Sequence, residues 1–220
     1  MAKENRSFAV IGLGAFGGTV ATELARFGNQ VIGVDIDELR VARLADELTS
    51  TVILDTTDEQ GLREAGIDRY DVALVSIGEN IEASILTTMN LKMLGVGTIW
   101  VKAANRTHHR ILSKLGADRV ILPEQDMGQR VSQMLNNPVV EDYASLRNGY
   151  SVVNIHLPER LDGTELNALR RIAGEDLRFL GLMRGTAFHS CNDNALTVQA
   201  DDRLIVLGKR ADLRAFGDAL

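Results

Sequence analysis

The chain has 220 residues, of which 45% are hydrophobic and 25% charged, proportions that are ordinary for a globular protein. Its formal net charge of -6 argues against a general nucleic-acid binder, which needs a basic surface to displace counterions. The lone cysteine, Cys191, excludes an internal disulfide and fits a reducing cytoplasm. No segment approaches the roughly 18 apolar residues of a membrane span, so contact with a membrane would require a partner.

The first 135 or so residues alternate short apolar runs with amphipathic segments of helical spacing. Apolar strands that alternate with helices are typical of a parallel sheet covered on both faces. Right-handed crossovers then make it a doubly wound α/β sheet of the Rossmann type. We expect strands at 8–11, 30–35, 51–54, 72–75, 98–101 and 119–122, and helices near 19–27, 38–48, 58–65, 81–94, 106–114 and 124–135.

The pattern changes after Asn136-Asn137-Pro138, which breaks the last of these helices. Residues 151–157 alternate apolar and polar side chains, as a half-exposed strand does. The sequence therefore predicts a nucleotide-binding domain over residues 1–138, with a crossover helix at about 124–136, and a small α+β subdomain over 139–220. In this subdomain we expect a helix near 165–173 and further strands near 178–183, 187–190 and 203–208.

A glycine-rich turn with the spacing Gly12-x-Gly14-x-x-Gly17 lies between the first strand and the first helix. Gly12 makes the tight turn, Gly14 lets a phosphate approach the backbone, and Gly17 lets helix and strand pack. The N–H groups at the start of the helix then face the phosphates. The alternative is a glycine turn without a ligand. We predict a nucleotide site that includes Gly12, Gly14, Ala15, Phe16 and Gly17.

An acidic residue, Asp35, ends the second strand 23 positions after Gly12. An acid at this place accepts hydrogen bonds from ribose hydroxyls and repels a 2′-phosphate, which disfavours NADP. Ile36 follows Asp35 in the predicted site, whereas Asp37 is expected to cap the next helix.

Other strand ends should face the same crevice, because ligands of such sheets lie at the carboxyl ends of the strands. We expect the edge of an adenine base to lie near the end of the third strand. At Gly78 we expect the ligand to approach the backbone closely. Lys102 could pair with a phosphate, the alternative being a surface lysine. The residues added to the site on this ground are Asp55, Thr56, Ser76, Ile77, Gly78 and Lys102.

No catalytic constellation is evident. His108 and His109 are adjacent, so they diverge by about 100° on a helix and do not form a metal pair. His189 and Cys191 share one face of a predicted strand, but a Cys-His nucleophile pair requires an exposed, activated thiol. The second domain is also small for the substrate domain of a dehydrogenase. We therefore predict that the protein is not an enzyme.

Five segments resemble the RCK (KTN) domain of Ktr/Trk potassium-uptake regulators, and in particular the single-RCK regulatory subunit of Ktr-type transporters. The likeness covers essentially the whole chain and rests on residues 8–18, 34–37, 77–86, 101–103 and 114–128. It implies a non-enzymatic cytoplasmic subunit at the inner face of the membrane. Such subunits form dimers and then an octameric ring beneath a membrane K⁺ transporter.

The resemblance also implies a ligand. ATP and ADP would bind the Rossmann site and change the shape of the ring, and NAD or NADH can occupy the same pocket. Asp35 would hold the ribose and Lys102 would lie near the phosphates. Glu124 would help to place a divalent cation or Na⁺ at the γ-phosphate, close to a subunit boundary.

Two departures from the family pattern affect binding. Family members usually carry arginine where this chain has Ala15, and a charge-assisted hydrogen bond to a phosphate contributes about 1.5–3 kcal/mol. Its absence should weaken triphosphate binding and blunt discrimination between ATP and ADP.

The C-terminal subdomain binds cyclic di-AMP in some relatives. Here it lacks the usual proline near Ser190-Cys191-Asn192, and Arg170 is either a contact or a surface arginine.

The leading hypothesis is thus a regulatory subunit of a potassium transporter. The alternative is a small NAD(H)-binding redox sensor or dehydrogenase, which would turn over NADH and have a small particle mass. A nucleic-acid-binding redox repressor lacks both a helix-turn-helix segment and a basic face in this sequence.

Overall fold

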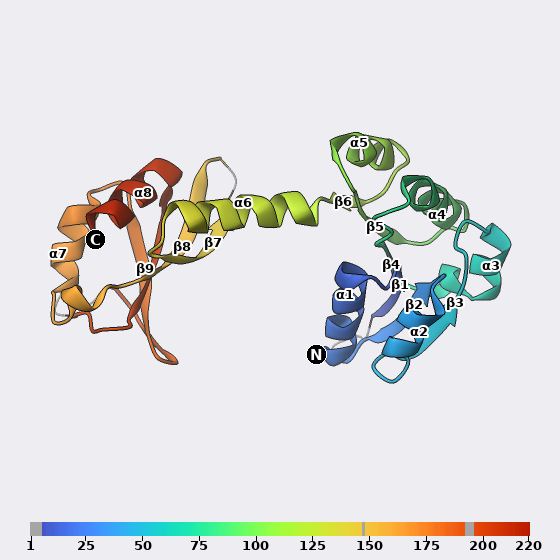
Figure 1. The fold of residues 1–220 in the computed structure, drawn as a ribbon, viewed down its shortest axis with the longest axis horizontal. Coiled ribbons are helices and arrows are strands. Elements are labelled where there is room, and N and C mark those ends of the chain that lie inside the picture. Colours follow the sequence, from blue (N-terminus) through green and yellow to red (C-terminus); the bar gives the residue numbers. More distant parts are fainter. Residues whose placement is uncertain (1–5, 147, 192–195) are drawn as a thin grey trace. The chain divides into compact units, whose positions relative to one another are not determined.

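The computed structural model describes residues 6–146, 148–191 and 196–220. The chain divides into two compact units, one ending at Pro123 and the other running from Glu124 to Leu220. Each unit has its own sheet, shown in Figure 1, and its own buried apolar core, which forms two clusters in the first unit and one in the second. Within the described residues, no helix is long and apolar enough to cross a lipid bilayer.

The first unit contains a six-stranded parallel sheet with the order β3-β2-β1-β4-β5-β6, which confirms the doubly wound Rossmann topology. Its strands are β1 (Ser7–Ile11), β2 (Gln30–Asp35), β3 (Ser50–Ile53), β4 (Val72–Val75), β5 (Thr98–Lys102) and β6 (Arg119–Ile121). Its helices are α1 (Ala15–Arg26), α2 (Glu38–Leu44), α3 (Glu59–Glu64), α4 (Ile81–Met93) and α5 (Arg106–Lys114), with a 3₁₀ turn η1 (Ile67–Arg69). The strand order reverses between β1 and β4, which is where such sheets bind ligands.

Strand β1 is buried on both faces of the sheet. Ala9 and Ile11 belong to the core cluster on one face, and Val10 belongs to the cluster on the other. All three are at most 1% exposed. Beyond Ser7 the strand therefore has no polar side of its own, which explains why residues 8–11 are an unbroken apolar run.

The second unit contains a five-stranded antiparallel sheet with the order β10-β9-β11-β8-β7. Its strands are β7 (Val140–Ser145), β8 (Tyr150–His156), β9 (Arg178–Arg184), β10 (Ala187–His189) and β11 (Arg203–Lys209). Its helices are α6 (Pro123–Asn136), α7 (Leu166–Ala173) and α8 (Arg210–Ala219), with a 3₁₀ turn η2 (Glu159–Leu161). The predicted strands and helices of the α+β subdomain are all present.

Two elements of the second unit, β7 and α8, have no counterpart in the prediction. Only Val140 and Tyr143 are buried in β7, and its register shifts between Val140 and Asp142, so no alternating pattern marks it. Helix α8 begins at Arg210 directly after β11, and the preceding Lys209 makes no capping hydrogen bond through its side chain. Neither a turn residue nor a helix cap thus separates this helix from the strand.

Candidate nucleotide-binding site

The glycine turn after β1 is shaped by packing at two of its three glycines. Gly12 has φ +90°, and a Cβ there would lie 3.0 Å from the carbonyl carbon of Ser76. A Cβ on Gly17 would lie 1.9 Å from the carbonyl oxygen of Gly12. Both residues must therefore be glycine for α1 to pack against the sheet, as predicted.

Gly14 differs from the other two glycines. It has φ −63°, and a Cβ there would meet only the Nη1 atom of Arg40, at 3.9 Å. The fold itself thus leaves room for a side chain at this position. The bare backbone of Gly14 instead keeps the surface of the turn open to a ligand, which is the role assigned to this glycine in dinucleotide-binding turns.

Helix α1 begins at Ala15, four residues before the predicted start. Gly17 and Gly18 are buried where the helix packs closely against the strand, so they lie inside the helix rather than ahead of it. Its N-cap, Gly14, makes no side-chain hydrogen bond, and no acidic residue lies in the first turn. The first N–H groups of a helix have no partner within it and carry a partial positive charge. Ala15 is exposed at this end of the helix, so the N–H groups can face a phosphate.

Asp35, which is 6% exposed, ties the end of β2 to the glycine turn. Its Oδ2 accepts a hydrogen bond from the N–H of Leu13 at 2.6 Å, and its Oδ1 accepts one from Asp37 at 3.0 Å. Each carboxylate oxygen has a further lone pair, so ribose hydroxyls could still donate to it. Asp37 caps α2 by accepting from the N–H of Leu39 at 2.9 Å, which confirms its predicted role.

Arg40 is a neighbour of this site that the sequence reasoning missed. Its Nη1 lies 3.6 Å from Asp35 Oδ2, and its Nε lies 3.5 Å from Asp37 Oδ2. Its side chain is 43% exposed beside Gly14. An arginine in the first turn of a surface helix gives no sequence signal that distinguishes it from a solvent-facing one.

The ends of β4 and β5 bring further predicted residues to the turn. A Cβ on Gly17 would lie 3.0 Å from Ser76 Oγ, and a Cβ on Gly78 would lie 3.3 Å from Lys102 Nζ. Lys102 Nζ also lies 5.7 Å from the ring centroid of Phe16. The carboxyl ends of the central strands therefore bring Ser76, Gly78 and Lys102 to the glycine turn. Ile77 lies between Ser76 and Gly78 in the same segment.

The end of β3 is engaged in local hydrogen bonds. Asp55 accepts from the N–H and the hydroxyl of Thr57, at 3.0 and 2.7 Å, and these bonds lower the pKa of its carboxyl group. The hydroxyl of Thr56 is buried against that of Thr87 at 2.7 Å. Asp58 caps α3. Contact of Asp55 and Thr56 with an adenine edge stays a prediction, as does that of Ile36, which is 68% exposed.

Glu124 lies in the first turn of α6 and belongs to the second unit, so its approach to a nucleotide stays a prediction. Nowhere in the described residues do three His, Cys, Asp or Glu side chains gather to hold a metal ion. A cation at Glu124 would accordingly need phosphate oxygens or a second subunit as additional ligands. Mg²⁺ is commonly bound in this way, by one or two carboxylates together with substrate phosphates.

Two of the residues considered for catalysis, Cys191 and His108, are buried, whereas His109 and His189 are half-buried. Cys191 is 2% exposed, and burial raises the pKa of its thiol despite the nearby charge of Arg170. His108 is 1% exposed, its Nδ1 accepts from the N–H of Ala104 at 3.2 Å, and burial lowers its pKa. A buried, protonated thiol is a poor nucleophile. Asn192, at the position considered for cyclic di-AMP, lies outside the described residues.

Comparison with known proteins places this site in a family. The family model for the TrkA-N domain matches residues 8–123, which include every predicted site residue of the first unit. The chain is 38% identical over 213 residues to the Ktr system potassium uptake protein A of Bacillus subtilis (strain 168), covering 97% of this chain and 96% of that protein.

Two solved structures share the fold at low sequence identity. A structure described as the GsuK channel bound to NAD has a TM-score of 0.64 and 12% identity, covering 98% of this chain and 39% of the channel chain. The GsuK RCK domain has a TM-score of 0.51 and 22% identity, covering 99% of this chain and 47% of that chain. The chain therefore belongs to the family of Ktr potassium uptake proteins, which are regulatory proteins of RCK fold and not enzymes.

Proposed function

We propose that this protein is a cytoplasmic, nucleotide-sensing regulatory subunit that gates a membrane K⁺ transporter from the inner face of the membrane. Binding of ATP or ADP, or alternatively of NAD or NADH, would change the shape of a ring built from its copies. A nucleotide shifts the balance between two ring shapes by no more than its difference in affinity for them. Membership of a family of regulatory proteins favours this function over the alternative of a dehydrogenase.

The observation that carries the proposal is the open surface at Gly14. The two other glycines of the turn are required by the fold, whereas Gly14 is not. Gly14 is the N-cap of α1, and the preceding Leu13 donates its N–H to Asp35. A nucleotide would place its phosphates over Gly14 and its ribose on Asp35. Lys102 would then contribute positive charge to the phosphates, and Glu124 would share a divalent cation or Na⁺ with the γ-phosphate.

Replacing Gly14 with alanine is expected to leave the fold intact and weaken ATP and ADP binding by about tenfold or more, because a methyl group separates the phosphates from the backbone. Calorimetric titration of both nucleotides measures the affinities. Gly128→Ala is the matched control, since a Cβ there meets no atom within 4 Å. Absence of nucleotide binding in the unchanged protein, or equal binding by Gly14→Ala, would contradict the proposal.

Helix α6 supports the proposal of a homo-oligomer. Met127, Val131 and Leu135 are spaced four residues apart and thus line one face of the helix, and they are 53%, 42% and 78% exposed. A continuous apolar stripe on a surface helix marks an interaction site. We infer that a second copy covers this stripe, and that the resulting dimers assemble into an octameric ring.

Introducing glutamates at Met127 and Val131 together is expected to reduce the particle mass, because burying two charges in an apolar interface is strongly unfavourable. Light scattering after size-exclusion chromatography measures this mass. The control places glutamates at Gln129 and Ser132, which are exposed on a different face of α6. If both double variants keep the mass of the unchanged protein, the stripe is not the interface.

A further inference from the structure

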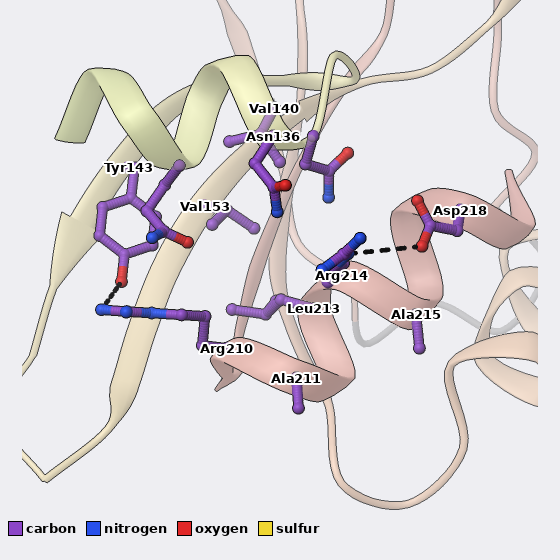
Figure 2. A pocket seen from close by; sticks show the side chains of 12 residues that line it. Asn136, Val140, Tyr143, Val153, Arg210, Ala211, Leu213, Arg214, Ala215 and Asp218 are labelled. Carbon is purple, nitrogen blue, oxygen red and sulfur yellow. Dashed lines mark hydrogen bonds and ion pairs between the residues drawn. The ribbon is translucent and has the colours of Figure 1, made fainter. Parts of the chain in front are cut away.

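A cavity of about 540 Å³ lies in the second unit, between the end of α6, the strands β7 and β8, and α8. Figure 2 shows its lining side chains, with Val140, Val153 and Leu213 supplying the apolar part of the wall. Its volume falls within the range of sites that bind small organic molecules. All of its lining residues lie between 133 and 218, so it is separate from the glycine turn.

Two arginines of α8 give this cavity an excess of positive charge. Arg210 and Arg214 line it together with one carboxylate, that of Asp218. Arg214 Nε lies 3.8 Å from Asp218 Oδ2, and both side chains are at least 60% exposed, so this ion pair is weak and does not saturate the guanidinium. Positive charge concentrated in a cavity is notable in a chain whose net charge is -6.

A buried hydrogen-bonded pair holds Arg210 in place. Tyr143 Oη accepts from Ser151 Oγ at 2.7 Å and from Arg210 Nη2 at 3.3 Å. Burial alone would raise the pKa of Tyr143, but the bonds from Ser151 and Arg210, with the charge of Arg210, bring it below its ordinary value. The Arg210 guanidinium has five N–H donors, so the bond to Tyr143 leaves others to face a ligand.

Asn137 adds a polar side chain to the wall of the cavity. It lines the cavity and is only 7% exposed. A Cβ on Gly217 would lie 2.4 Å from Asn137 Nδ2, so the glycine of α8 makes the room that this side chain occupies. A carboxamide carries two N–H donors, so Asn137 can donate to an anion in the cavity.

We propose that this cavity binds a small organic anion, whose phosphate or carboxylate is held by Arg210, Arg214 and Asn137. The apolar body of the ligand would pack against Val140, Val153 and Leu213. Guanidinium groups pair well with both kinds of anion, whereas the apolar wall selects an organic molecule over a free inorganic ion. The site is independent of the nucleotide site and does not rest on the function proposed above.

Calorimetric titration of the full chain with four probes tests this assignment: phenyl phosphate, benzoate, phenol and inorganic phosphate. Phenyl phosphate or benzoate is expected to bind saturably with a Kd of about 1 mM or tighter. Phenol lacks the charge and inorganic phosphate lacks the apolar body, so each should bind about tenfold more weakly or worse. The stronger of the two organic probes identifies the anionic group. Failure of both to bind, or equal binding of phenol, overturns the proposal.

Two substitutions locate the binding in the cavity. Arg214→Gln and the near-isosteric Asn137→Asp should each weaken the better probe by about tenfold, the first by removing a positive charge and the second by adding a negative one. Arg171→Gln, on the exposed side of α7, is the matched control and should bind the probe normally. Circular dichroism checks folding, and an ATP titration of each variant should match the unchanged protein, which separates this result from any failure of the nucleotide site.

Loss of probe binding in Arg171→Gln as well as in Arg214→Gln overturns the assignment, because it indicates a nonspecific effect of charge. A change of particle mass in Arg214→Gln, with no probe bound by the unchanged protein, also overturns it. In that case the cavity is covered by another copy of the chain rather than by a small molecule.

Discussion

Replacing Gly17 with alanine is expected to lower the free energy of unfolding of the first unit by about 3 kcal/mol or more. The added Cβ would lie 1.9 Å from the carbonyl oxygen of Gly12 and 3.0 Å from Ser76 Oγ. A backbone oxygen cannot move aside without opening the turn between β1 and α1. Urea denaturation followed by the fluorescence of Trp100 measures the effect, since this is the single tryptophan of the chain and it lies in β5.

Gly14→Ala is the matched control for this measurement, because its Cβ would meet only Arg40 Nη1 at 3.9 Å. Its unfolding midpoint should stay close to that of the unchanged protein. The pair of variants thus separates a glycine needed for packing from a glycine needed for a ligand. Similar midpoints for Gly17→Ala and Gly14→Ala would show that the turn does not hold helix and strand as closely as described.

Replacing Ala15 with arginine is expected to tighten ATP binding by about tenfold, the effect of one charge-assisted hydrogen bond to a phosphate. Ala15 is exposed as the first residue of α1, so the longer side chain has room beside the turn. The affinity for ATP should increase more than the affinity for ADP, because the attraction grows with the negative charge near the guanidinium. Titration of both nucleotides into the unchanged protein and the Ala15→Arg variant measures the change in discrimination.

Thr19→Arg is the control for Ala15→Arg. Thr19 is exposed one turn further along α1, where its hydroxyl donates to the carbonyl of Ala15 at 2.8 Å. The Thr19→Arg variant adds the same charge to the same helix at a greater distance from the glycine turn. Its effect on affinity should therefore be small and similar for both nucleotides. Equal ATP/ADP discrimination in the unchanged protein and in Ala15→Arg would rule out a special role for the residue at this position.

Much of the first unit could be predicted from the sequence because its determinants are local. The buried strand β1 has an apolar sequence, and Gly12 and Gly17 follow it at the spacing that the turn requires. Asp35 ends β2, and its bond to Leu13 follows from the parallel pairing of β1 with β2. In each case, a short segment and the general topology of a doubly wound sheet are sufficient.

The features that could not be predicted depend on side-chain direction or on contacts between distant segments. The sequence places Thr56 at a strand end, but not its hydroxyl against Thr87 of α4. The cavity of the second unit combines side chains of α6, β7, β8 and α8, and two of these elements, β7 and α8, were not predicted from the sequence. Arg210 meets Tyr143 across 67 positions, and no motif encodes such a pairing.

The central claim is that copies of this chain form a ring that senses a nucleotide, and native mass spectrometry of the purified protein tests it most directly. This measurement reports the mass of the particle and of any small molecule bound to it. We predict a particle of eight copies of the 24.0 kDa chain that carries an adenine nucleotide and retains it less well in Gly14→Ala. A monomer or dimer without bound nucleotide, in the presence of added ATP or ADP, would contradict the account.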